Sequence, residues 1–226
     1  MSEFTSGFLM ERIHMGKVAK YAQSRSVMKE LNHKWIVYLT EGDNDAGIMD
    51  MSHEYPVMYF DHEEDHGWGY RIYDHGKIIA SLRINYELEE GLLWEMAQER
   101  YPEGDLIEIV YNQAGDELRE EIKNNFDELI LQSFAEANIG SFAVFGFTHE
   151  HLETLNATLT PSEVRSGSNI FQIVNTFKSV LQLEEMSWIN YDHVVEDANY
   201  DLMLTDSRHP TWIQWLEYKG EASSGN

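Results

Sequence analysis

Hydrophobic and polar residues alternate most clearly between residues 68 and 86. Hydrophobic side chains occupy every second position in residues 68–73 and again in residues 78–86, and Asp74-His75-Gly76 separates the two runs. A period of two places successive side chains on opposite faces of a strand. Glycine allows the positive φ angle of a tight turn. We therefore predict an antiparallel hairpin, with residues 57–60 as a third strand.

Apolar stretches elsewhere in the first half of the chain are shorter. Residues 8–13 and 17–22 flank His14-Met15-Gly16 and are interpreted as a second hairpin, or as a weak internal repeat of the first. Four further elements are expected on weaker patterns: a short helix at residues 24–31 and strands at 35–40, 106–111 and 142–147.

In the second half of the chain, apolar residues recur every three or four positions, as on one face of a helix. This spacing predicts helices at residues 89–100, 116–137 and 170–181. The capping residues Thr160-Pro161-Ser162-Glu163 predict the start of a further helix. Strands therefore come first and helices later. We predict an α+β fold, in which an antiparallel sheet of N-terminal hairpins or a meander packs against amphipathic helices mostly from the C-terminal half.

No stretch rich in Pro, Gly or Ser divides the chain. We expect a single α+β domain over residues 1–219, with a possible seam near residues 102–105. Residues 220–226 are expected to form a flexible tail.

The chain carries 40 Asp and Glu against 16 Lys and Arg, a net charge of -24. Residues 1–34 hold six basic and three acidic groups, a net charge of +3, so the remaining residues carry -27. Such a surface repels nucleic acid and anionic membranes and attracts basic proteins. There is no cysteine, no long apolar window and no secretory signal pattern. A cytoplasmic location is therefore expected.

The densest polar cluster is Asp61-His62-Glu63-Glu64-Asp65-His66, which lies between two predicted strands. Its carboxylates Asp61, Glu63, Glu64 and Asp65, together with the neighbouring Trp68, are candidates for binding a basic partner. The alternative is a solvated hairpin loop without a binding role.

Histidines suggest a different site. His62 and His66 could ligate a divalent metal together with His149 and His151, if the two loops meet. The alternative for the second pair is that Thr148 caps a helix, so that the two rings point apart. The sequence contains no zincin motif, phosphate-binding loop or nucleophile elbow. Apart from this possible metal ion, we expect no cofactor.

Three functions remain. The preferred hypothesis is a binding module, inhibitor-like or immunity-like, for a basic protein partner. The first alternative is a metal-dependent hydrolase built on the histidine and carboxylate clusters, and enzymatic activity is the less favoured reading. The second alternative is a small-molecule or carbohydrate binder with an aromatic groove, for which the candidate residues are Trp68, Tyr70, Trp188, Tyr191, Trp212 and Trp215. The pattern does not fix the oligomeric state.

Overall fold

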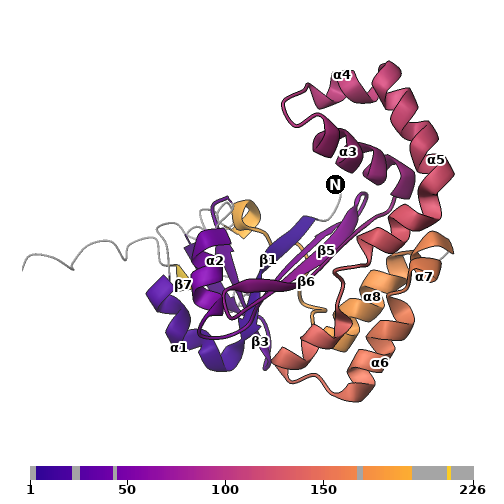
Figure 1. Cartoon of the computed structure of the whole chain (residues 1–226). Coiled ribbons are helices and arrows are strands. Elements are labelled where there is room, and N and C mark those ends of the chain that lie inside the picture. Colours follow the sequence, from indigo (N-terminus) through magenta and orange to yellow (C-terminus); the bar gives the residue numbers. More distant parts are fainter. Residues whose placement is uncertain (1–3, 22–25, 43–44, 167–169, 195–212, 215–226) are drawn as a thin grey trace, which may run out of the picture.

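A computed structural model of the chain describes residues 4–21, 26–42, 45–166, 170–194 and 213–214. The described residues form one antiparallel sheet with helices on both faces and a helical extension at one end (Figure 1). The strands are β1 (Phe4–Glu11), β2 (Ser26–Glu30), β3 (Trp35–Thr40), β4 (Val57–Glu63), β5 (Gly67–Asp74), β6 (Lys77–Asn85) and β7 (Ile213–Gln214).

Strand β1 lies in the middle of the sheet, whose order is β6-β5-β4-β1-β3-β2-β7. On one side of β1 the hairpin of β2 and β3 pairs through β3, and on the other side the meander β4-β5-β6 pairs through β4. The meander holds the polar cluster that the sequence singles out, so its register determines which of those residues share a face.

Most helices follow the meander along the chain. The short elements η1 (Arg12–His14), α1 (Met15–Val18), η2 (Ala19–Tyr21) and α2 (Asp45–Ser52) come before it. After it come α3 (Leu88–Arg100), α4 (Leu106–Val110), α5 (Gln113–Ser133), η3 (Ile139–Phe145), α6 (His149–Thr158), α7 (Pro161–Ser166) and α8 (Ile170–Leu181).

The larger hydrophobic core fills the sheet face that η3, α6, α7 and α8 cover. Phe177 of α8 lies at its centre, fully buried, with ring centroids 4.7 Å from Trp68 and 5.3 Å from Tyr70. Aromatic rings bury large apolar areas, so this packing fixes α8 on the meander.

A smaller core fills the opposite face, under α1 and α2. Phe8 and Tyr38 contribute from β1 and β3, and Ile48 and Met51 contribute from α2. Figure 1 shows α2 on one side of the sheet and α6 and α8 on the other. Both faces of the β1–β3 region are therefore apolar, which explains why β3 is buried along its whole length.

Helices α3, α4 and α5 form a unit that we call the helical arm, residues 88–133. It extends from the end of β6, at the top right of Figure 1. The arm has its own small core, in which Leu93, Leu118 and Ile122 are buried. Leu88 and Phe134 pack against both this core and the larger sheet core. These two side chains form the base of the arm.

The structure confirms the α+β class, the antiparallel sheet and the preference of helices for the later part of the chain. The predicted hairpin is present as β5 and β6. His75 and Gly76 both have positive φ at its turn, 51° and 72°. These angles match a type I′ turn, whose twist suits two adjacent strands.

Four local predictions are wrong. The described part of the expected strand at residues 17–22 belongs to α1 and η2, because β3 and β4 occupy both sides of β1, where the second strand of that hairpin would lie. In the described part of the expected helix at residues 24–31, residues 26–30 form β2, whose neighbours Val27 and Met28 enter different cores. The expected strand at residues 142–147 is largely η3. There Phe142 and Phe145, three residues apart, both enter the larger core.

The expected strand at residues 106–111 is helix α4. The side chain of Asp105 accepts hydrogen bonds from the backbone N–H groups of Ile107 and Glu108, at 3.0 and 3.2 Å. This N-cap satisfies two donors that a helix would otherwise leave unpaired. The cap therefore outweighs the strand preference of a run rich in isoleucine and valine.

The proposed seam at residues 102–105 lies in the turn between α3 and α4, within the helical arm. The expected tail at residues 220–226 lies outside the described residues. Across the described part of the chain, no helix is both long and apolar enough to cross a membrane.

Candidate functional site

The five residues predicted to bind a partner are divided between the two faces of the sheet and the turn between β4 and β5. Asp61 and Glu63 lie on one face of β4, while Trp68 of β5 is fully buried in the larger core on the other face. Glu64 and Asp65 are exposed in the turn between these strands. A partner that binds the turn can therefore reach Glu64 and Asp65, but not Trp68.

Asp61 belongs to a polar row across three strands. It pairs with Gly69 in β5, and Gly69 pairs with Arg83 in β6. A Cβ atom on Gly69 would lie 3.2 Å from Cδ of Arg83, so glycine leaves room for the arginine to cross β5. The guanidinium of Arg83 forms an ion pair with Asp61, and its Nη2 lies 3.2 Å from Oε1 of Glu63. Both carboxylates are thus held by a cation of the same chain.

The environment of Asp61 is largely closed to solvent, with 10% of its side chain exposed. Burial raises the pKa of the Asp61 carboxyl above its ordinary value, and the nearby Arg83 guanidinium counteracts part of that shift. Arg83 itself is 38% exposed at the rim. This arrangement suits an internal ion pair that joins β4 to β6 better than it suits a free anionic contact site.

The four candidate metal ligands lie in three different settings. His62 is buried on the face opposite Asp61, where its Nε2 lies 2.9 Å from the hydroxyl of Tyr86. His66 is exposed in the turn between β4 and β5. His149 and His151 are in the first turn of α6, and Nε2 of His149 lies 3.3 Å from Oε1 of Glu153. Among the described residues, which include all four histidines, no group of three or more His, Cys, Asp or Glu could hold a metal ion.

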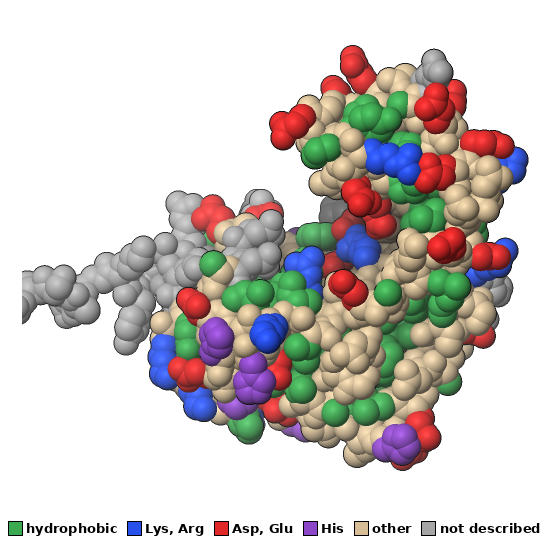
Figure 2. All heavy atoms as spheres, viewed as in Figure 1, with side chains coloured by type: hydrophobic (Ala, Val, Ile, Leu, Met, Phe, Trp, Pro, Cys, Tyr) green, Lys and Arg blue, Asp and Glu red, His purple; other side chains and the backbone are tan. Residues whose placement is uncertain are grey.

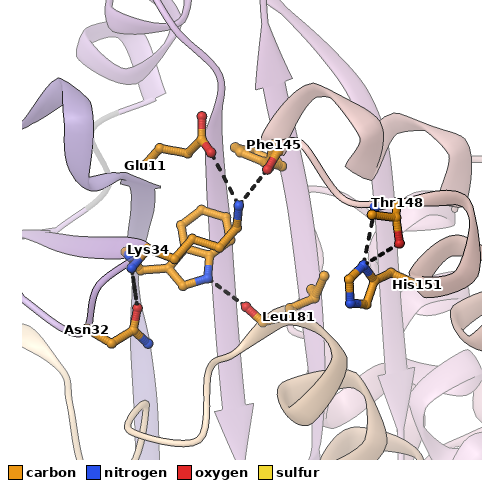
Figure 3. Close-up of polar contacts among 8 residues, drawn as sticks. Glu11, Asn32, Lys34, Phe145, Thr148, His151 and Leu181 are labelled. Carbon is orange, nitrogen blue, oxygen red and sulfur yellow. Dashed lines mark hydrogen bonds and ion pairs between the residues drawn. The ribbon is translucent and has the colours of Figure 1, made fainter.

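His151 has a local role at the start of its own helix. Its Nδ1 accepts a hydrogen bond from the backbone N–H of Thr148 at 3.2 Å and lies 2.8 Å from the Thr148 hydroxyl (Figure 3). The ring folds back over the N-terminus of α6, where unpaired backbone donors need partners.

Figure 3 also shows how the sheet is fastened to the elements that cover it. The ammonium group of Lys34 donates to the carbonyl of Phe145 at 2.6 Å and lies 3.2 Å from Oε1 of Glu11. The indole N–H of Trp35 donates to the carbonyl of Leu181 at 2.6 Å. These contacts hold η3 and the end of α8 against the sheet, which is a structural function.

A small pocket of about 190 Å³ opens between β1, the end of β3 and the segment that follows α8. Phe4, Tyr59 and Tyr191 provide aromatic walls, and Ser6 and Asp192 provide polar groups. This volume is below the range of roughly 300–1,000 Å³ that is usual for drug-sized ligands. Of the other aromatic candidates, Tyr70 is buried in the larger core, Trp188 is 39% exposed, and Trp212 and Trp215 lie outside the described residues.

The helical arm carries a high net negative charge. Residues 88–133 contain 13 acidic and 3 basic side chains, a net charge of -10 in 46 residues. Two of the three cations are engaged within the arm: Arg100 lies 2.5 Å from Glu121 and Arg119 lies 3.3 Å from Asp116. In Figure 2 the arm is the upper right part of the molecule, with red carboxylates along its visible surface.

The tip of the arm also exposes large apolar side chains. Ile107 is 65% exposed, Tyr111 is 73% exposed, and Tyr101 at the end of α3 is 38% exposed. Sequence reasoning missed this feature, because it interpreted residues 106–111 as a strand. The signal was present: Asp105 followed by Glu108 three positions later is a helix-start pattern, and a helix would have placed Ile107 and Tyr111 on one face.

Comparisons with protein-family models, with curated proteins and with solved structures find no match to this chain. The geometry and charge of the chain itself are therefore the basis for its proposed function.

Proposed function

We propose that this protein is a binding module for a basic protein partner, with an inhibitor-like or immunity-like role, and that the helical arm is its binding surface. The observation that carries the proposal is the concentration of charge: the arm makes up 46 of 226 residues but carries -10 of the net -24. Surfaces of one sign steer partners of the opposite sign and speed their association.

The arm suits this role better than the polar cluster of residues 61–66. In that cluster, Asp61 and Glu63 already pair with Arg83. By contrast, Glu103, Glu108 and Glu120 of the arm are exposed. A cationic partner can approach these carboxylates without breaking an internal ion pair, so their attraction remains available for binding.

The test uses a peptide of alternating Lys and Gly as a probe, because it presents positive charge without apolar side chains. Binding is measured by isothermal titration calorimetry at about 0.05 M and about 0.5 M NaCl, since exposed charges are screened within about 10 Å at 0.1 M salt. We expect binding at low salt that weakens at least about tenfold at high salt.

A matched pair of variants locates the site. One variant replaces Glu103, Glu108 and Glu120 of the arm by Gln. The control removes the same number of charges elsewhere, through Glu64→Gln, Asp65→Asn and Glu184→Gln. The proposal predicts that the arm variant binds the peptide less tightly than the control. An equal loss of peptide affinity in both variants, or a larger loss of affinity in the control, would reject the arm as the binding surface.

A second candidate function is small-molecule binding, which the pocket beside β1 favours. Phe4, Tyr59 and Tyr191 could stack on a sugar ring while Ser6 and Asp192 accept hydrogen bonds from its hydroxyl groups. Glucose serves as the probe, and tyrosine and tryptophan fluorescence is the readout. A saturable change that Ser6→Phe abolishes would support this function, and an unchanged signal would remove it.

A further inference from the structure

The outward face of α4 carries two large apolar side chains one helical turn apart. Ile107 and Tyr111 are four residues apart, and the backbone N–H of Tyr111 donates to the carbonyl of Ile107 at 3.2 Å. This spacing places both side chains on the same face of a helix. The other side of α4 faces the arm core, where Val110 is buried and Leu106 and Ile109 are partly buried. Ile107 and Tyr111 are thus the side chains that α4 leaves for contact with another molecule.

This apolar pair is not an isolated exposed residue of the kind that every protein surface carries. Nine large hydrophobic side chains are exposed among the described residues, and three of them lie in residues 101–111. Tyrosine is enriched among the side chains that dominate binding energy at protein interfaces. A group of exposed apolar residues at the end of a projecting arm is therefore typical of a contact surface.

The local backbone holds this face in place before any partner binds. Asp105 caps α4 through two backbone N–H groups, and the Asn112 side chain caps α5 by accepting from the N–H of Ala114 at 2.8 Å. Both ends of the short segment are thus fixed. A preformed face loses less conformational freedom on binding than a flexible loop does.

Charge complementarity identifies the kind of molecule that fits. Glu103, Asp105 and Glu108 surround the apolar pair in the sequence, and all three are exposed. Figure 2 shows green apolar side chains beside red carboxylates at this end of the arm. A partner with an apolar side chain flanked by Lys or Arg would match both properties, with the apolar contact at the centre and ion pairs at the rim.

We infer that the outward face of α4, centred on Ile107 and Tyr111, is the anchor point at which the basic partner protein docks. The partner places an apolar side chain against these two residues and sets Lys or Arg against Glu103, Asp105 and Glu108. This inference rests on the proposed function and adds to it the place and chemistry of the contact.

The test compares two peptides: the alternating Lys–Gly peptide, and the same peptide with Leu in place of its two central Gly residues. Their affinities are measured for the wild-type protein, for the double variant Ile107→Ser with Tyr111→Ser, and for Leu131→Ser. Leu131 is the matched control because it is an exposed apolar residue of α5, 61% exposed, in the same arm. Circular dichroism confirms that each variant keeps its helices.

We expect the Leu-containing peptide to bind the wild-type protein at least about tenfold more tightly than the Lys–Gly peptide. The double variant loses this gain but binds the Lys–Gly peptide as before, and Leu131→Ser retains the gain. If the gain is absent, or survives in the double variant, the anchor inference is overturned while charge-driven binding to the arm stands. If neither peptide binds at low salt, the proposed function fails as well.

A second copy of the chain is the alternative occupant of this face. Sedimentation velocity of the wild-type protein and the double variant decides between the two. Self-association that Ile107→Ser with Tyr111→Ser abolishes would show that the face joins two copies and would overturn docking of a basic partner. A monomer in both cases supports the inference.

Discussion

The helical arm and the body of the molecule, meaning the sheet and its covering helices, differ in both packing and charge. Among the described residues, the larger sheet core contains 29 buried side chains and the arm core contains seven. The arm nevertheless carries -10 in 46 residues, whereas the other 180 residues carry -14. In Figure 2, blue and purple side chains gather at the lower left, away from the arm. Most of the buried core therefore lies in the body, while the arm carries more negative charge per residue than the rest of the chain as a whole.

The largest effect is expected in the body. Phe177→Ala should lower the free energy of unfolding by about 3–5 kcal/mol, because it removes a fully buried ring from the centre of the larger core. Urea denaturation measures this change. Phe171→Ala in the same helix is the control, since Phe171 is 55% exposed, and we expect a change below about 1 kcal/mol. Similar values for the two variants would contradict the assigned core.

A core substitution in the arm tests whether the two regions unfold separately. Leu118→Ala should lower the free energy of unfolding of the arm by about 2–5 kcal/mol, the usual range for a buried leucine. Because the arm joins the larger core at Leu88 and Phe134, most of this loss should appear as local opening. Hydrogen exchange should accelerate in residues 88–133 while sheet amides keep their protection. Uniform acceleration throughout the protein would mean that arm and body form one cooperative unit.

The sequence predicts some strands of the sheet better than others. Alternation in residues 68–86 predicts β5 and β6 because the large side chains Trp68, Tyr70 and Ile72 share one face of β5, and β6 buries only the face that carries Ala80, Leu82 and Ile84. It fails for β2, where both faces are covered and the two apolar residues, Val27 and Met28, are adjacent and enter different cores. Local patterns also do not report which strands become neighbours, which is why the 17–22 segment was placed in the sheet.

Net charge favours a cationic partner as the ligand, and the densest acidic cluster, residues 61–66, is where the sequence predicts its site. Sequence spacing does not show that Arg83 crosses β5 to reach Asp61, because that contact depends on strand register and on the small size of Gly69. Nor does it show that the acidic residues of α3, α4 and α5 are brought together in one projecting arm.

Repulsion among the carboxylates of the arm should itself be measurable. Glu120 follows Asp116 by four residues and Glu117 by three on α5. Glu120→Gln should therefore stabilise the protein by about 0.2–0.5 kcal/mol. Lys123→Gln on the same helix should destabilise the protein, because it removes a positive charge from among these carboxylates. Thermal melts at low and high salt measure both effects, and changes of equal sign in the two variants would argue against repulsion.

The smallest expected effect concerns the body at acidic pH. Burial lowers the pKa of His14 below its ordinary value of 6.5, nearby Lys17 lowers it further, and Glu11 partly opposes the shift. The His14 ring stacks on Tyr55 with centroids 4.6 Å apart. Because the folded state favours neutral His14, its contribution to stability is complete above pH 6.5 and is lost as pH falls through the lowered pKa.

His14→Phe keeps an aromatic ring beside Tyr55 but removes the titrating group. Urea denaturation between about pH 7 and pH 5 should then show a smaller loss of stability in the variant than in the wild-type protein. Parallel curves for the two proteins would show that other groups account for the pH dependence.

The most direct test of the arm as a binding surface is a map of backbone amide chemical shifts on addition of the alternating Lys–Gly peptide at low salt. The account predicts that the shifted amides lie in residues 88–133, with the largest changes around α4, and that high salt reverses them. Shifts confined to residues 61–66, or spread over the body with the arm unchanged, would contradict it.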